Sequence, residues 1–140
     1  LKSTAKKYYD IKQKREQEDK KHLVVISSCE AVLNTYNKLI CSSGYTASLF
    51  TSPQDAFEAL LAGRPDAILC DLFMHDLTGF DFAREIRDLY PVEEVPLIVS
   101  TRQKDLDNKT LSRAMEKSGV NAMCEFPAKT SQIKSWVRPA

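Results

Sequence analysis

The residues best suited to carry chemistry stand at the ends of short apolar segments. Asp71 directly follows the segment 67–70, while Ser27 and Ser28 follow another such segment and Thr101 follows a third. A carboxylate can act as a nucleophile when neighbouring groups neutralise the charge that develops, and hydroxyl groups can donate hydrogen bonds to that charge. Whether Asp71 can act in this way depends on how the fold arranges these segments.

Five apolar, β-branched segments alternate with five helical patterns along the chain. Strands are expected at 23–26, 47–50, 67–71, 96–100 and 122–126. Apolar residues at helical spacing predict helices at 31–40, 53–62, 79–90, 105–118 and 133–137. This alternation is typical of βαβ units, and right-handed crossovers close them into a doubly wound, five-stranded parallel α/β sheet with helices on both faces. Ligands of such a sheet gather at the carboxyl ends of its strands, where Asp71 stands.

Residues that cap helices support these boundaries. Ser52 and Pro53 have the types favoured at the N-cap and the first turn of a helix. Gly44, Gly63 and Gly119 follow the ends of three helical patterns, where glycine is common.

The composition is that of a folded domain of ordinary size. The chain has 140 residues, of which 43% are hydrophobic and 28% charged, and its net charge is +1. No apolar run approaches the ~20 residues that span a bilayer, and the sequence shows no basic-then-apolar pattern with a small-residue cleavage site, so we expect a cytoplasmic protein without a membrane partner. Because the sequence begins at Leu1, we also expect it to be part of a longer chain.

The amino-terminal segment differs in charge from the rest. Residues 1–22 hold eight Lys and Arg against four Asp and Glu, whereas the remaining residues carry a net negative charge. The acidic residues are interleaved with the basic ones, which favours a solvated helix over a nucleic-acid contact. We expect an N-terminal helical arm over 1–21, as at the end of a preceding domain, and one α/β domain over 22–138.

Other reactive side chains form no pattern typical of a metal or redox site. The cysteines lack metal-ligand spacing and are expected to be small buried hydrophobes; they are Cys29, Cys41, Cys70 and Cys124. His75 is expected to be solvated beside Asp76. Asp105 and Lys109 are expected to form a surface ion pair.

The stretch 66–87 resembles the third strand, loop and third helix of bacterial response-regulator receiver domains, which are CheY-like. It has an Asp that ends an apolar strand, then Met74, then Gly79, and then a helix that contains Arg-Glu-Ile-Arg at 84–87. The resemblance extends over 22–137 and agrees with the flavodoxin-like sheet expected above.

This resemblance implies a phosphotransfer switch. In the family, the Asp that ends the third strand accepts a phosphoryl group from a phosphohistidine on a partner kinase, and its place corresponds to Asp71. A Thr or Ser after the fourth strand donates to the phosphoryl oxygens, and its place corresponds to Thr101. Two further features neutralise the charge. One is Mg²⁺, held by the acceptor and by an acidic pair after the first strand; the other is a Lys after the fifth strand.

The sequence departs from the family at the charge-neutralising positions. Ser27 and Ser28 stand in place of the acidic pair, and neutral hydroxyls are poor ligands for Mg²⁺. Phe126 stands in place of the Lys, and Met123 in place of the family's switch aromatic. We therefore expect a degenerate receiver of a two-component phosphorelay. It would not be an enzyme, would hold no metal or cofactor, and would act through protein–protein contacts.

Two other functions stay open. Asp71 could remain a working phosphoryl acceptor with a non-standard metal site, which is the one case that requires Mg²⁺. A flavodoxin-like domain can also bind a small ligand, although a fold alone does not give a function. The implied partners are a histidine kinase or other signalling protein and the neighbouring domains of a larger regulator. A homodimer would pair through the face of the fourth helix, fifth strand and fifth helix.

Overall fold

A computed structural model describes residues 20–137 of the chain. The helical arm expected over 1–21 lies outside these residues except for Lys20 and Lys21, neither of which is helical.

The described residues form one parallel sheet with the strand order β2-β1-β3-β4-β5. The strands are β1 (His22–Ile26), β2 (Thr46–Phe50), β3 (Ala67–Asp71), β4 (Leu97–Thr101) and β5 (Ala122–Glu125). The predicted five-stranded α/β fold is thus confirmed. Since all the strands run the same way, the carboxyl ends of β1, β3 and β4 meet at one edge of the sheet, with Asp71 opposite Ser100.

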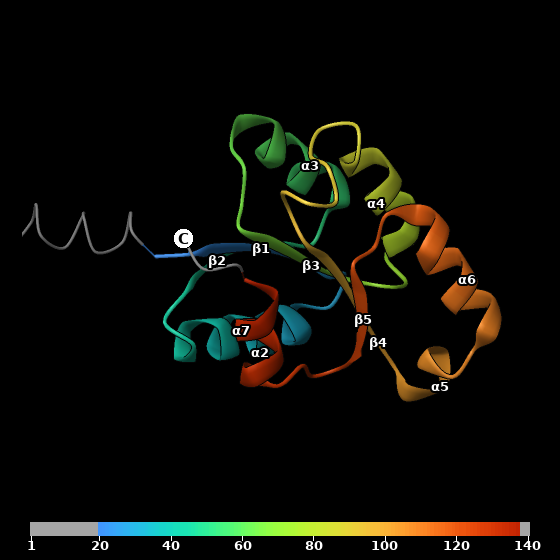
Figure 1. The fold of residues 1–140 in the computed structure, drawn as a ribbon. Helices are drawn as coiled ribbons and strands as arrows, with labels where there is room; N and C mark the ends of the chain where they lie inside the picture. Colours follow the sequence, from blue (N-terminus) through green and yellow to red (C-terminus); the bar gives the residue numbers. More distant parts are fainter. Residues whose placement is uncertain (1–19, 138–140) are drawn as a thin grey trace, which may run out of the picture.

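Helices cover both faces of this sheet (Figure 1). They are α2 (Glu30–Ser42), α3 (Pro53–Ala62), α4 (Gly79–Ile86), α5 (Gln103–Leu106), α6 (Lys109–Ser118) and α7 (Thr130–Trp136). Figure 1 shows α2 and α7 on one face and α3, α4 and α6 on the other. Parallel strands that are apolar on both faces need helices on both sides of the sheet, and these helices provide that cover.

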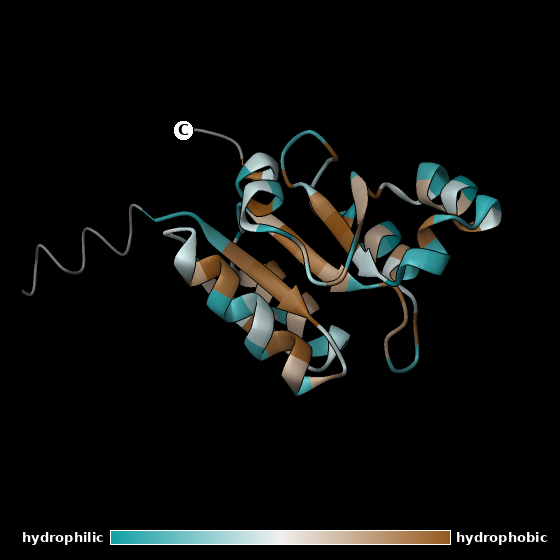
Figure 2. Cartoon of the chain, turned by 90° about the horizontal axis from the view of Figure 1, so that it is seen from below, coloured by the Kyte–Doolittle hydropathy of each residue, from teal (hydrophilic) through white to brown (hydrophobic). Residues whose placement is uncertain are grey.

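The core consists of two apolar clusters, one on each face of the sheet. Along β3, Ile68 and Cys70 belong to the cluster under α3 and α4, whereas Ala67 and Leu69 belong to the cluster under α2 and α7. Successive side chains of a strand point to opposite faces, so a central strand must be apolar throughout. Figure 2 shows these apolar strands between helices whose outer sides are hydrophilic.

The helix predicted over 79–90 is shorter than expected and ends at Ile86. The residue before a proline disfavours helical backbone angles, and Pro91 follows shortly after this point. The chain instead forms turns in which the backbone N–H of Tyr90 donates to the carbonyl of Ile86 at 2.8 Å. The Arg87 side chain donates to the carbonyl of Tyr90 at 3.1 Å and holds this turn.

The helix predicted over 105–118 is also wrong in its boundaries, because the structure has two helices there, α5 and α6. The side-chain oxygen of Asn108 accepts hydrogen bonds from the backbone N–H groups of Thr110 at 2.9 Å and Leu111 at 3.3 Å. Asn108 is therefore the N-cap of α6, and an N-cap residue has extended rather than helical backbone angles. Gly119 ends α6 in a left-handed conformation, as predicted for a C-terminal cap.

Gly79 lets α4 begin directly against the end of β3. A Cβ atom at this position would lie 2.8 Å from the backbone oxygen of Asp71, which is closer than a real contact allows. The N–H of Gly79 donates to the carbonyl of Leu72 at 2.7 Å, which closes the loop 72–78. The capping box of Thr78 and Asp81 fixes the start of the helix at the same place. The loop after Asp71 is thereby held near the carboxyl edge of the sheet.

Candidate functional site

Asp71 lies at the carboxyl end of β3, where it is flanked by the ends of β1 and β4. The hydroxyl of Ser27, which is fully buried, donates a hydrogen bond to Asp71 Oδ2. Ser27 Oγ also accepts from the backbone N–H of Cys29 at 3.1 Å. Ser27 and Asp71 were both predicted to stand at strand ends on the carboxyl edge of the sheet, and the structure brings them into contact. The group that meets this carboxylate is thus a neutral hydroxyl.

A hollow of about 220 Å³ opens above Asp71. Of the residues singled out from the sequence, Asp71, Thr101 and Phe126 all line it. Arg102 and Phe73 line it as well, and the sequence analysis assigned no role to either. The three predicted positions are therefore close in space, and the hollow has both aromatic and charged walls.

The Thr101 hydroxyl is already hydrogen-bonded to a nearby side chain, that of Asp105. It donates to Asp105 Oδ2 at 2.7 Å, and Arg102 Nε lies 3.5 Å from the same oxygen. The hydrogen bond from Thr101 and the nearby Arg102 guanidinium hold the pKa of the Asp105 carboxyl below its usual value. The prediction of a surface ion pair between Asp105 and Lys109 is wrong, because Asp105 is buried and its partners are Thr101 and Arg102.

Ser28 stands in the second position of the family's acidic pair, and it holds the loop after β3. Its Oγ accepts from the backbone N–H of His75 at 3.0 Å. The His75 ring lies 3.6 Å from Asp76 Oδ1, and both side chains are more than four-fifths exposed. The prediction that this pair is solvated is confirmed.

Phe126, which stands where the family has a Lys, follows β5 and precedes Pro127 across a cis peptide bond. Its ring meets that of Tyr36 edge to face, with the centroids 5.4 Å apart. The Tyr36 hydroxyl forms a hydrogen bond with Ser100 Oγ and accepts from the backbone N–H of Ala128 at 3.3 Å. Tyr36 is thus a third residue, after Arg102 and Phe73, to which the sequence alone gave no role in the site. It was counted only as an apolar helix position, although a buried phenol requires polar partners.

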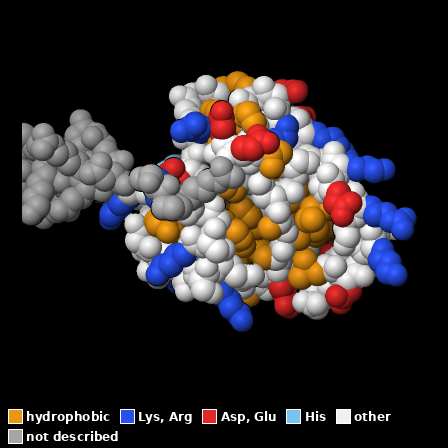
Figure 3. Space-filling view, viewed as in Figure 1, with side chains coloured by type: hydrophobic (Ala, Val, Ile, Leu, Met, Phe, Trp, Pro, Cys, Tyr) orange, Lys and Arg blue, Asp and Glu red, His pale blue; other side chains and the backbone are white. Residues whose placement is uncertain are grey.

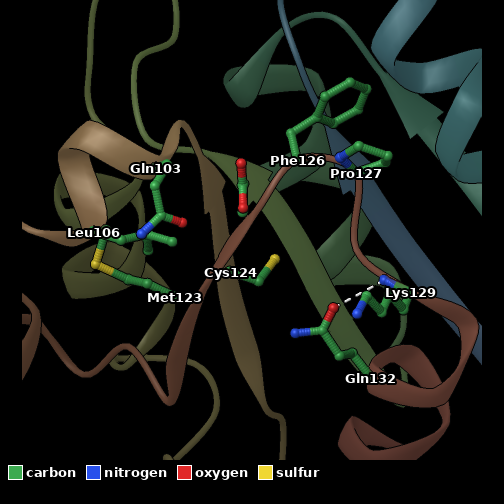
Figure 4. Close-up of a pocket in the computed structure, with 9 residues that line it drawn as sticks. Gln103, Leu106, Met123, Cys124, Phe126, Pro127, Lys129 and Gln132 are labelled. Carbon is green, nitrogen blue, oxygen red and sulfur yellow. Dashed lines mark hydrogen bonds between the residues drawn. The ribbon is translucent and has the colours of Figure 1, made fainter.

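Met123 belongs to a different cavity, which runs along β5 between α5 and α7. This cavity has a volume of about 520 Å³. In Figure 4, Met123 and Leu106 lie at one end of it, and Lys129 and Gln132 lie across β5. Figure 3 shows hydrophobic side chains on both sides of β5 and Lys and Arg side chains on the rim formed by α6. Phe126 lines both this cavity and the hollow above Asp71.

The four cysteines are all free thiols, and Cys70 and Cys124 are buried as expected. Cys29 and Cys41 are exposed, so the expectation of burial is wrong for these two. Cys29 lies at the start of α2 and Cys41 near its end, at exposed positions where a small side chain needs no contact with the core.

The donor atoms around Asp71 do not fit Mg²⁺. This ion prefers an octahedral shell of oxygen ligands that includes carboxylates. The neighbouring Ser27 and Ser28 oxygens are hydroxyls already engaged in hydrogen bonds. Within residues 20–137, no group of three or more His, Cys, Asp and Glu side chains is arranged to hold a metal ion. Asp71 is therefore the one carboxylate that lines the hollow.

Comparison with known proteins agrees with this architecture. The family model for the response regulator receiver domain matches residues 23–138. The chain therefore belongs to the response regulator receiver domain family, whose members act in two-component signalling. A CheY-like receiver domain from Methanospirillum hungatei has a similar fold, with a TM-score of 0.72 over 84% of this chain and 90% of that one, at 14% identity.

Two curated relatives are similar in sequence over part of their length. The response regulator MprA of Mycobacterium ulcerans is 25% identical over 87 residues, which are 62% of this chain and 37% of that protein. The aerobic respiration control sensor protein ArcB of Escherichia coli is 28% identical over 95 residues, which are 66% of this chain and 12% of that protein. The chain thus matches little more than a third of the first relative and about an eighth of the second. No helix in the described part of the chain is long and apolar enough to cross a membrane.

Burial raises the pKa of the Asp71 carboxyl above its usual value, and the hydrogen bond from Ser27 offsets this only in part. The folded state therefore holds this proton more tightly than the unfolded state does. Stability contributed by the protonated form is present below the unfolded pKa and is lost as the pH rises through the folded pKa.

We accordingly expect Asp71→Asn to raise the melting temperature at pH 7 by a few degrees, because the amide removes the buried charge and still accepts from Ser27. The gain should shrink as the pH falls through the raised pKa of the folded state, and it should be gone below about 4, where the carboxyl is protonated in both states. Thermal unfolding between pH 3 and pH 8 measures this, with Asp88→Asn on the surface as the control. A destabilised Asp71→Asn protein at pH 7 would contradict the expectation.

Proposed function

We propose that this chain is a degenerate receiver that signals through protein–protein contacts, without a Mg²⁺-dependent phosphorylation cycle and without an enzymatic activity of its own. The observation that carries this proposal is the pairing of Asp71 with the Ser27 hydroxyl, at a site where Phe126 supplies an aromatic wall. We also propose that the domain acts in the cytoplasm and uses no cofactor.

The electrostatics of phosphoryl transfer support this proposal. The protein's contribution to such a reaction is mainly positioning and neutralisation of the transferred charge. Removal of a single stabilising donor commonly costs about 10²-fold or more in rate. Around Asp71 two such contributions are missing, since Ser27 and Ser28 are not carboxylates and Phe126 carries no charge. The remaining family donor, Thr101, is hydrogen-bonded to Asp105.

The cavity along β5 is the proposed surface for pairing with a second copy or with a neighbouring domain. Its lining combines apolar side chains, Met123 and Leu106, with polar ones on α5 and α7 (Figure 4). Interfaces commonly have such an apolar centre and a polar rim. A histidine kinase or another signalling protein remains the proposed partner of the domain in its pathway.

A titration with beryllofluoride and Mg²⁺ tests the proposal. Beryllofluoride mimics a phosphoryl group on a carboxylate, so a working acceptor binds it saturably. We expect no saturable change in the NMR spectrum or in the fluorescence of Trp136. Saturable binding that disappears in Asp71→Asn would overturn the proposal and favour the working acceptor, with Arg102 as the cation that lines the same hollow. Binding that persists in Asp71→Asn would place the ligand elsewhere and leave Asp71 without the acceptor role.

A further inference from the structure

Two exposed aromatic side chains border the hollow above Asp71. Phe73 is 57% exposed and Phe126 is 37% exposed. Both line the same hollow, together with Val32 at the start of α2. Apolar surface left in water costs about 25 cal/mol per Å². Aromatic side chains are also enriched at the centres of protein interfaces. The position of these two rings therefore indicates a surface that another molecule covers.

Among the residues that line this hollow, Arg102 is the one with a positive charge, and Asp71 is the one carboxylate. Arg102 has a side chain that is 65% exposed, and its contact with Asp105 uses Nε at 3.5 Å. Within residues 20–137, Arg102 is paired through Nε, so its two terminal nitrogens remain as donors on the wall of the hollow. The polar groups deeper in the hollow are already bonded, Asp71 to Ser27 and Thr101 to Asp105. An incoming group therefore meets apolar walls and a single cation with free donors.

The size of the hollow favours a side chain over a free small molecule. Pockets that enclose small ligands usually measure about 300–1,000 Å³ and bury most of the ligand. This hollow has about 220 Å³ and two walls that are themselves exposed. One apolar side chain fits such a space, and the rest of a partner's surface would cover the rings from above.

We propose that the hollow receives an apolar side chain of a partner protein, with a carboxylate of the same partner on Arg102. Phe73 and Phe126 form the walls for the side chain, and the Arg102 guanidinium binds the carboxylate through its terminal nitrogens. This arrangement combines the residue types that dominate binding energy at interfaces. The inference rests on the proposed function, because a phosphoryl group on Asp71 would occupy the same space.

Capped pentapeptides serve as probes of this site. The test peptide has one phenylalanine between two glutamates, with a glycine at each end. Its binding is measured by the shifts of the backbone amide NMR signals of the 140-residue chain. We expect saturable shifts in the millimolar range at Phe73, Thr101 and Arg102. A peptide with lysines in place of the glutamates should bind at least about fivefold more weakly. A peptide with alanine in place of the phenylalanine should show no saturation.

Variants of the chain locate the binding. Phe73→Ser should abolish the shifts, and Arg102→Gln should weaken binding of the acidic peptide at least about fivefold without changing that of the lysine peptide. Leu61→Ser is the control for loss of an exposed apolar side chain, since Leu61 is 58% exposed on α3. Lys104→Gln is the control for loss of a nearby positive charge on α5. Both controls should bind the acidic peptide as the unchanged protein does.

Several results would overturn this inference. They are shifts confined to the β5 cavity, equal binding of the acidic and basic peptides, or an absence of saturation. Free 3-phenylpropionate that binds as tightly as the peptide would show a small-molecule site instead. Shifts at Phe73 that depend only on protein concentration would show a second copy as the occupant. If the peptides fail while beryllofluoride also fails to bind, the proposed function survives and only this inference falls.

Discussion

The triple variant Ser27→Asp, Ser28→Asp and Phe126→Lys should gain Mg²⁺ affinity of at least about tenfold, equivalent to ~1.4 kcal/mol. Ser27 already contacts Asp71, so an aspartate there adds a second carboxylate beside the first. An aspartate at Ser28 adds a third from the loop side. Three carboxylates supply the hard oxygen ligands that Mg²⁺ prefers. Isothermal calorimetry with MgCl₂ measures the gain.

The same variant should also bind beryllofluoride, because a lysine at position 126 would add a positive charge to the wall of the hollow. The double variant without Phe126→Lys separates the two effects. It should bind Mg²⁺ but bind beryllofluoride more weakly than the triple variant does, since one neutralising charge is missing.

A matched control exists elsewhere in the chain. Ser42 and Ser43 form another pair of adjacent serines, at the end of α2, and their hydroxyls donate only to the backbone carbonyls of Lys38 and Leu39. Replacement of both by aspartate adds two negative charges away from Asp71, which is the same change in net charge as in the double variant Ser27→Asp and Ser28→Asp. If this control gains as much Mg²⁺ affinity as the double variant, the effect is one of net charge. If neither gains, the assignment of Ser27 and Ser28 to the family's acidic positions is wrong.

The sheet and the meeting of strand ends could be predicted from the sequence because they depend on local patterns. Buried parallel strands are apolar on both faces, and the ends of such strands meet at one edge. Asp71 and Ser27 are 44 residues apart, yet this rule predicted that both stand at the same edge of the sheet. The cap at Ser52 was predictable for a similar reason, since its partner is the N–H of Asp55 three residues on.

Other contacts in the site could not be predicted, because they involve partners that a sequence pattern does not reveal. Asp105 was expected to pair with Lys109 at helical spacing, but the helix is broken between them at Asn108. Asp105 instead accepts a buried hydrogen bond from the Thr101 hydroxyl. The Tyr36 hydroxyl meets Ser100, which is 64 residues away on the sheet. An amphipathic pattern shows that Tyr36 is buried, but it does not show which polar group its hydroxyl reaches.

Arg87→Ala should lower the free energy of unfolding by about 3–5 kcal/mol, an unusually large loss for one substitution. Nε of Arg87 donates to the carbonyl of Gly119 at 2.8 Å, and Nη1 donates to that of Val95 at 2.9 Å. Nη2 donates to Asn121 Oδ1 at 2.8 Å. These bonds join the end of α4 to the loop before β4 and to the turn before β5. Truncation leaves several partly buried carbonyls without a donor, and each such loss costs about 1–3 kcal/mol.

The neighbouring Arg84 provides the control, because both arginines belong to the same Arg-Glu-Ile-Arg motif. Arg84 is exposed, and within the described part of the chain its side chain forms an ion pair only with Asp81, three residues earlier, at 2.8 Å. Exposed pairs of this kind contribute about 0.2–1 kcal/mol, so Arg84→Ala should change stability little. Urea unfolding of both variants, with Arg87→Lys as an intermediate, measures the difference. Equal losses for Arg84→Ala and Arg87→Ala would mean that the motif acts through helix propensity. A loss confined to Arg87 would mean that its fork of donors joins α4 to the segments that lead into β4 and β5.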